Sequence, residues 1–171
     1  MSDAARSTAP VTLADLARLA AIAVADRESR FARRPRWRPY ADRILCVALC
    51  QGAALHYVDG RNGVKDFDVY TFYAESSIGR FPARWLTHAD FGPSPHGRHP
   101  DDAPSYRGRR VDLIGRSLRA NPGDDPVLAL RHYLGHPTTA TARHLAEKAV
   151  VLIDPEPLRG DVVWTPADQG R

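Results

Sequence analysis

Two aspartates separated by one residue are the strongest chemical signal in the sequence. Asp66 and Asp68 lie in the segment 64–73, which is rich in β-branched and aromatic residues and is therefore predicted to be a strand. Because side chains alternate along a strand, both carboxylates project to one side, while Phe67 and Val69 point into packing. Adjacent carboxylates repel unless a positive group lies between them, and oxygen ligands of this kind suit Mg²⁺ or Mn²⁺. The pair therefore predicts a divalent-cation site.

A third aspartate lies further along the chain. Asp112 sits between two apolar residues in the segment 109–114, which is predicted to be another short strand. Acidic side chains are rarely buried without a partner, so this carboxylate requires one. Pairing with a nearby arginine such as Arg116 is one explanation. The other is that Asp112 completes the metal site of Asp66 and Asp68.

The segment before the acid pair predicts how the pair is held. Residues 44–50 form a continuous apolar run, typical of a strand buried on both faces. A tight turn at Gln51-Gly52-Ala53 follows and leads into a short helix that is predicted to begin at Gly52. The turn-rich residues 59–63 then precede the strand of the acid pair. The turn and the acid pair are therefore expected on consecutive elements of one fold.

Helices are predicted on both sides of this region. Thr12 and Asp15 have the spacing of a capping box at the start of the first helix. Asp124 or Asp125 can cap the second, ahead of Pro126. The predicted outer elements are a helix from Thr12 to about Arg27 or Glu28, a helix from Pro126 to about Leu134, a helix from about Thr138 to Val151, and a short strand at Val162–Trp164.

Two segments are expected to be irregular. Residues 30–39 combine five arginines with Phe31 and Trp37, which suits either contacts with phosphate or single-stranded nucleic acid, or a solvated connector over the core. The two prolines of this segment favour the connector. Residues 76–108 contain five prolines and no sustained periodicity, and the spacing of their histidines and aspartates matches no standard zinc motif. We expect a mobile loop that borders a substrate pocket.

Length and composition fit one domain. The chain has 171 residues, of which 43% are hydrophobic, and contains no apolar run long enough to span a membrane and no signal peptide. We therefore expect a soluble, cytoplasmic protein with a disordered N-terminus at 1–10 and a single domain at 11–171. Cys46 and Cys50 are expected to be buried thiols.

The charge of the chain is carried mainly by arginine. Net charge is +4, and 22 of the 24 basic residues are arginine. Arginine suits bidentate contact with phosphate, so the composition permits a nucleotide or nucleic-acid partner. A coding bias toward arginine explains the same composition equally well.

The order of these motifs resembles that of the polymerase-beta-like nucleotidyltransferase superfamily, in the form of a small bacterial member. In that superfamily a glycine turn follows the first strand, an Asp-x-Asp lies on the next strand, and a third acid lies on a later one. The corresponding residues here are Gln51-Gly52, Asp66-Phe67-Asp68 and Asp112, and the resemblance covers about residues 44–114. It implies an α/β (α+β) fold with a small mixed β-sheet flanked by helices.

The resemblance also implies a chemistry. The carboxylates of Asp66, Asp68 and Asp112 would bind Mg²⁺ or Mn²⁺ ions, which clamp the triphosphate of a nucleoside triphosphate and activate an attacking hydroxyl. The turn residues Gln51, Gly52 and Ala53, together with Lys65, would bind the nucleotide, because glycine lets backbone N–H groups approach phosphates and a helix N-terminus favours anions. Ala53 departs from the superfamily, which usually has a serine whose hydroxyl helps to hold a phosphate.

Two functions follow from this resemblance. The first is metal-dependent transfer of a nucleotidyl group to a hydroxyl on a small molecule, a protein or an RNA. The second is a non-catalytic module of the same fold that binds a partner, for example within a toxin–antitoxin pair. The three acids favour the first function, and Ala53 favours the second. A plain α/β domain whose acids pair with arginines is a third interpretation.

Overall fold

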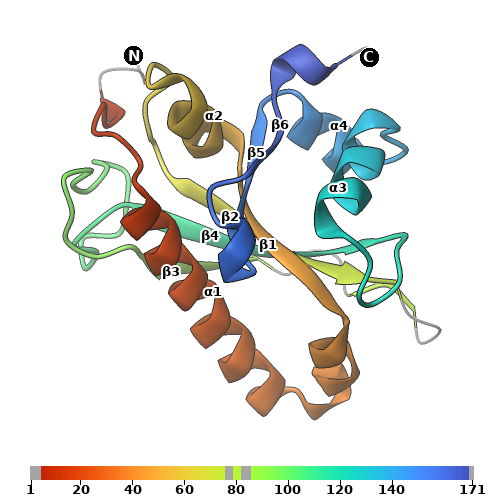
Figure 1. Cartoon of the computed structure of the whole chain (residues 1–171). Coiled ribbons are helices and arrows are strands. Elements are labelled where there is room, and N and C mark those ends of the chain that lie inside the picture. Colours follow the sequence, from red (N-terminus) through yellow and green to blue (C-terminus); the bar gives the residue numbers. More distant parts are fainter. Residues whose placement is uncertain (1–4, 76–78, 82–85, 170–171) are drawn as a thin grey trace.

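The protein is built on one six-stranded mixed sheet with strand order β3-β4-β2-β1-β5-β6 (Figure 1). The computed structural model describes residues 5–75, 79–81 and 86–169. Neighbouring strands are antiparallel except β2 and β4, which are parallel. The strands are β1 (Ile44–Cys50), β2 (Phe67–Ala74), β3 (Leu86–Asp90), β4 (Arg110–Leu118), β5 (Ala149–Asp154) and β6 (Val162–Trp164). The predicted α/β class with a small mixed sheet is confirmed.

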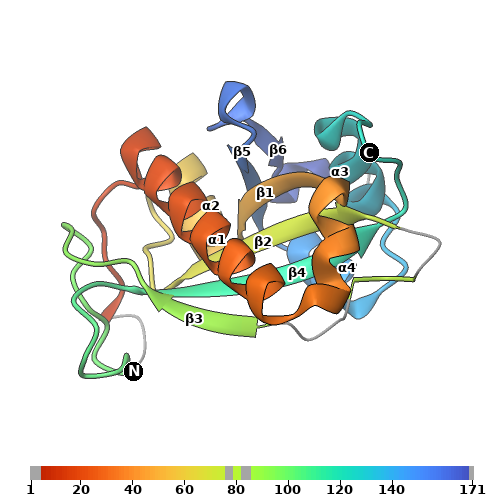
Figure 2. The same ribbon diagram turned by 90° about the horizontal axis from the view of Figure 1, so that it is seen from below.

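Helices cover both faces of this sheet. The α-helices are α1 (Leu13–Arg33), α2 (Gln51–Asp59), α3 (Pro126–Gly135) and α4 (Ala140–Ala146), and the 3₁₀ helices are η2 (Pro35–Arg43), η3 (Glu156–Leu158) and η4 (Pro166–Asp168). Residues of α1 and α2 pack in one hydrophobic cluster and residues of α3 and α4 in another, on opposite sides of the strands. Figure 2 shows α1 running across the strands on the face of the sheet that it covers. Alternate residues of each strand therefore face different pairs of helices.

The start of α1 follows the sequence prediction, but its end does not. Thr12 and Asp15 form the expected capping box, with the Asp15 carboxylate accepting the Thr12 N–H at 2.8 Å. The helix continues to Arg33, and η2 follows it, so most of the connector expected at 30–39 is helical. Trp37 and Tyr40 of η2 are buried in a small aromatic cluster, and this packing stabilises a segment whose prolines predicted a loop.

The predicted helix at 138–151 is wrong beyond Ala146. Helix α4 ends there, and Ala149–Asp154 form strand β5, which pairs with the buried strand β1. Apolar residues at 142–150 have helical spacing, but the continuous aliphatic run at 150–153, in which three of the four residues are β-branched, also suits a strand with both faces covered. The neighbouring strand supplies backbone partners and decides between the two.

The N-terminal segment is ordered where the structure describes it. Ser7 and Val64 exchange two backbone hydrogen bonds of 2.8 Å, and His56 Nε2 donates to the Ala9 carbonyl at 3.0 Å. The prediction of disorder at 1–10 is therefore wrong for residues 5–10, while residues 1–4 lie outside the described part. Helix α3, capped by Asp125, and the buried free thiols Cys46 and Cys50 are as expected.

The long segment 76–108 is partly regular. Residues 86–90 form the edge strand β3, while residues 76–78 and 82–85 lie outside the described residues. The Asp90 carboxylate accepts backbone N–H groups of Gly92, Arg107 and Gly108 at 2.8–2.9 Å, which closes the following loop at its base. Within the described ranges, no helix is both long and apolar enough to cross a bilayer.

Burial of β5 gives a test of its assignment. Leu152 is fully buried, so Leu152→Ala should lower the free energy of unfolding by about 2–5 kcal/mol through lost transfer energy and a residual cavity. Leu128→Ala is the matched control, since this side chain is 65% exposed and its loss should change stability by less than about 0.5 kcal/mol. Urea unfolding of both variants measures the difference, and equal effects would contradict the packing of β5.

Candidate functional site

One cavity of about 260 Å³ brings together the turn after β1 and the acid pair. The antiparallel register of β1 and β2 sets Cys50 opposite Asp68, so the end of β1, where α2 begins, lies beside the start of β2. This pairing explains why Gly52 and Asp66, which are 14 positions apart in the chain, line the same cavity. The cavity is lined by Arg6, Gln51, Gly52, Ala53, Lys65, Asp66, Asp68, Tyr70, His144 and Lys148.

Asp66 and Asp68 both line the cavity, although only Asp68 lies within a strand. Strand β2 begins at Phe67, so Asp66 immediately precedes it. Phe67 is fully buried in the cluster beneath α1 and α2, as its alternation with the aspartates predicts. The expected geometry of the pair is therefore present.

Asp112 lies level with Asp68 on the neighbouring parallel strand. In-register residues of adjacent strands project to the same side, so the third carboxylate shares the face of the other two. It does not line the cavity. Its oxygens instead contact Arg110 and His88: Arg110 Nε lies 2.8 Å from Oδ1, and His88 Nδ1 donates to Oδ1 at 2.7 Å.

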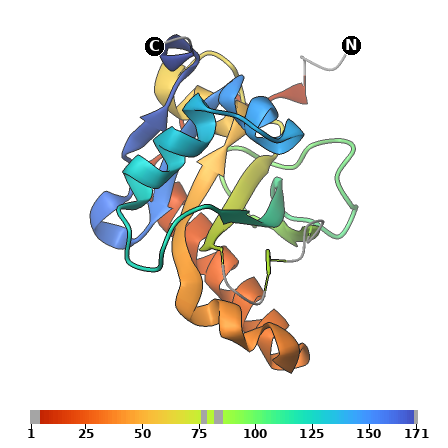
Figure 3. The same ribbon diagram turned by 90° about the vertical axis from the view of Figure 1, so that its right-hand side faces the viewer.

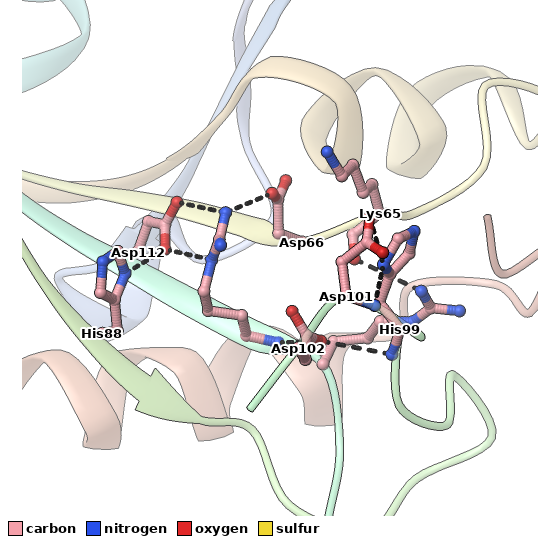
Figure 4. A network of polar contacts seen from close by, with 9 residues as sticks. Lys65, Asp66, His88, His99, Asp101, Asp102 and Asp112 are labelled. Carbon is pink, nitrogen blue, oxygen red and sulfur yellow. Dashed lines mark hydrogen bonds and ion pairs between the residues drawn. The ribbon is translucent and has the colours of Figure 1, made fainter. Parts of the chain in front are cut away.

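Arg110 joins two of the three acids. Its Nη2 donates to Asp66 Oδ2 at 3.0 Å and to Asp112 Oδ2 at 3.3 Å, so one guanidinium lies between the two carboxylates. Figure 4 shows Asp66 and Asp112 near one another, with dashed lines for these contacts and with His88 beside Asp112. The alternative that an arginine pairs with Asp112 is thus seen, but with Arg110 in place of Arg116, which donates to the Gly115 carbonyl.

Asp68 differs from the other two acids. Within the described part of the chain its carboxylate accepts no hydrogen bond, and it lies near Asp66 and Asp112. Burial, together with the charges of Asp66 and Asp112, raises the pKa of Asp68 to about 7 against the opposing effect of Arg110 and Lys148. This carboxylate is the one most in need of an additional cation.

The turn after β1 contains a left-handed backbone conformation, which is usual for glycine, at Gln51. Helix α2 begins at Gln51, which has a φ of 61°, rather than at Gly52. A left-handed residue with a side chain is strained by about 1–2 kcal/mol, and the Gln51 amide is held by a 3.3 Å hydrogen bond to the His144 carbonyl. The prediction that Gly52 begins the helix is wrong by one residue, although both residues line the cavity.

Gly52 leaves space for the positive groups of the cavity. A Cβ at this position would lie 3.0 Å from Asn62 Nδ2, 3.5 Å from an Arg6 nitrogen and 3.9 Å from Lys148 Nζ. Asn62 in turn donates to the Gly52 carbonyl at 2.9 Å. The backbone at Gly52 is therefore open toward two cationic side chains, an arrangement suited to an anion.

Several residues of the site were not predicted from the sequence. Arg6, His144 and Lys148 come from distant segments, and Arg110 and His88 surround the third acid. One sequence signal was present, because both lysines of this arginine-rich chain, Lys65 and Lys148, line the cavity. Of residues 79–81 and 86–108, none lines the cavity, which contradicts the prediction that this segment borders the pocket. Among its described residues, the segment approaches the acids through His88, which contacts Asp112 outside the cavity lining.

The described residues do not arrange three or more histidine, cysteine, aspartate or glutamate side chains as a ready-made metal cluster. Arg110 lies between two of the acids instead, and its single positive charge offsets part of the negative charge of Asp66 and Asp112. Comparisons with protein-family models, with curated proteins and with solved structures find no match to this chain. Its function is therefore inferred from the site itself.

The different surroundings of Asp68 and Asp112 predict opposite effects of the same substitution in EDTA. The folded pKa of Asp68, about 7, lies above its unfolded value, so wild-type stability falls as pH rises from about 4 to 7. Asp68→Asn lacks this loss and should be more stable than wild type by about 1–3 kcal/mol above pH 7. Denaturant unfolding across pH 4–8 measures the difference.

Asp112→Asn is the matched comparison. It removes the charge that pairs with a partly exposed Arg110, and should lower stability at pH 7 by about 1–2 kcal/mol. Destabilisation of similar size by both substitutions would contradict the asymmetry of the three acids.

Proposed function

We propose that this protein is a metal-dependent nucleotidyltransferase that binds a nucleoside triphosphate in the cavity between the start of α2 and the acid pair. The observation that carries the proposal is the convergence of Gln51-Gly52-Ala53 with Asp66 and Asp68 in that cavity. The order of helix, strand, turn, helix and Asp-x-Asp strand, followed by a parallel strand with Asp112 in register, supports a nucleotidyltransferase-like fold.

The charge distribution of the cavity supports a triphosphate as the ligand. Arg6, Lys65 and Lys148 supply positive charge to a lining whose carboxylates are Asp66 and Asp68. Phosphates are expected near Gly52, where a Cβ would approach Arg6 and Lys148 and where the first turn of α2 adds unpaired backbone N–H groups. The cationic side chains of the lining would then neutralise the phosphates, and Asp66 and Asp68 would lie beside the bound triphosphate.

The residues present fit a divalent cation at the acid pair. Asp68 is a partly buried carboxylate without a hydrogen-bond partner in the described structure, and Asp66 lines the same cavity, so these two would hold Mg²⁺ or Mn²⁺. When bound, the ion supplies charge neutralisation at the phosphates and activation of the acceptor hydroxyl. Asp112 is available to it only when Arg110 releases its contact.

The side chains of this site mainly position the nucleoside triphosphate and neutralise the charge of its phosphates. Gly52 allows close approach of the phosphates, and Lys148 and Lys65 offset their charge. Arg110 holds Asp66 and Asp112 at a fixed separation, which limits repulsion among the acids in the ligand-free protein. The acceptor is a hydroxyl of a small molecule, a protein or an RNA.

A non-catalytic module that binds a nucleotide or a protein partner, as in a toxin–antitoxin pair, is the second candidate. It is favoured by the guanidinium of Arg110 between two of the expected metal ligands. Ala53, which lines the cavity without a hydroxyl, favours it as well. Binding of a nucleotide without transfer would distinguish this module from the enzyme.

Ligand-dependent stability tests the proposal. Melting temperatures are measured in EDTA, Mg²⁺ and Mn²⁺, each with and without ATP, GTP, CTP or UTP, because a ligand that binds only the folded state raises its stability. We expect one or more metal–nucleotide combinations to raise the melting temperature of wild type, and Asp68→Asn to abolish the rise. Asp161→Asn, a control that removes an exposed aspartate, should behave as wild type.

Transfer itself is followed with nucleotides labelled on the α-phosphate, incubated with the protein and with protein, RNA and small-molecule fractions. Label that appears in an acceptor with wild type and not with Asp68→Asn supports the enzyme. Stabilisation by nucleotide without transfer supports the binding module. Absence of any stabilisation in all four nucleotides and both metals would overturn the enzyme and the nucleotide-binding module, and would leave a module that binds a protein partner.

The space at Gly52 gives a separate prediction. Gly52→Ala places a methyl group among Asn62, Arg6 and Lys148, and should weaken nucleotide binding by roughly tenfold or more, measured by calorimetric titration. Gly135→Ala is the matched control, since its Cβ would meet only the Trp164 ring at 3.9 Å. Equal affinities of the two variants would exclude a phosphate at the turn.

A further inference from the structure

A second and larger cavity, of about 550 Å³, lies at the other end of the same strands. Its lining includes Arg116, Arg119 and residues of α3 and α4. Figure 3 shows the molecule from the side on which these two helices lie. Arg116 is four residues beyond Asp112 on β4, which corresponds to about 13 Å along the strand. The two cavities share no lining residue, so the second requires its own explanation.

The lining of this cavity has an excess of positive charge. Its acid, Glu75, already accepts a 3.1 Å hydrogen bond from Arg80. Arg116 and Arg119 have no carboxylate partner among the described residues, and the Arg116 guanidinium donates to a backbone carbonyl. Two arginines that line one concave surface, where the acid among the described residues is already paired with Arg80, are suited to bidentate contact with a phosphate group.

Flat rings lie beside these arginines. His132 and His136, one turn apart at the end of α3, have ring centroids 5.0 Å apart and inclined by 33°. Tyr133 lines the same cavity, and the hydroxyls of Thr138 and Thr141 add hydrogen-bonding groups. The two histidines have no third metal-ligating side chain among the described residues, so this lining does not indicate a metal site. It offers ring faces, hydroxyls and guanidinium groups to one ligand.

We propose that this second cavity binds a small molecule that carries a phosphate group and a planar ring, with the phosphate at Arg116 and Arg119 and the ring near Tyr133 and His132. The volume falls within the range of roughly 300–1,000 Å³ that is usual for small-molecule sites. The proposal does not depend on a nucleotide in the first cavity, because no side chain is common to both.

Phenyl phosphate is the probe, and phenol is its neutral control. In wild-type protein labelled with ¹⁵N at histidine, phenyl phosphate should shift the ring signals of His132 and His136 in a saturable way, while phenol leaves them unchanged. His144 reports on the first cavity. A response of His144 alone, or an equal response to phenol, would overturn the assignment.

Matched variants test the two arginines. Arg116→Gln/Arg119→Gln should reduce the affinity for phenyl phosphate by roughly a hundredfold, since each loses a charged hydrogen-bond donor. Arg38→Gln/Arg143→Gln removes the same net charge outside the cavity and should retain wild-type affinity. Far-UV circular dichroism verifies the fold of both, and the histidine signals of wild type provide a test that does not depend on the variants. Equal loss in the two double variants would overturn the site.

Discussion

The antiparallel pairing of β1 with β2 is the constraint on which the first cavity depends. It sets Cys50 opposite Asp68, and therefore places the first turn of α2 beside the acid pair. The parallel pairing of β2 with β4 then sets Asp112 level with Asp68 and brings Arg110 beside Asp66. A shift of either register by one residue would send these side chains to the opposite face, into the cluster beneath α1 and α2.

The same strands must both bury a core and carry charge, and alternation makes this feasible. Phe67 and Val69 of β2, with Val111 and Leu113 of β4, are buried in the cluster beneath α1 and α2. Even-numbered residues begin with the acids at one end and continue to Tyr70, Phe72 and Leu118 beneath α3 and α4. The charged end is open to the first cavity, because those helices pack on the apolar end of the strands.

Charge is incompletely balanced among the three acids, and this imbalance is what the first cavity offers a ligand. Arg110 forms ion pairs with Asp66 and Asp112, whereas Asp68 has no such partner among the described residues and has a raised pKa. Arg6 and Lys148 lie near Gly52 in the same cavity. The cavity therefore presents carboxylates and cationic side chains together, and this mixed charge underlies the proposed metal-bound polyphosphate ligand. The second cavity has the basic component without free acids, and this difference favours distinct ligands.

The sequence by itself determined the local features of the protein. The apolar run of β1, the capping box of α1, the cap of α3 and the shared side of Asp66 and Asp68 follow from short-range periodicity and hydrogen bonding. Only the tertiary structure decided which arginine pairs with Asp112, since this depends on the register that places Arg110 between two acids. It also made residues 149–154 a strand, because β1 offers backbone partners that a helix would leave unused. Arg6 and Lys148 reach the cavity from distant segments, and no local pattern encodes that approach.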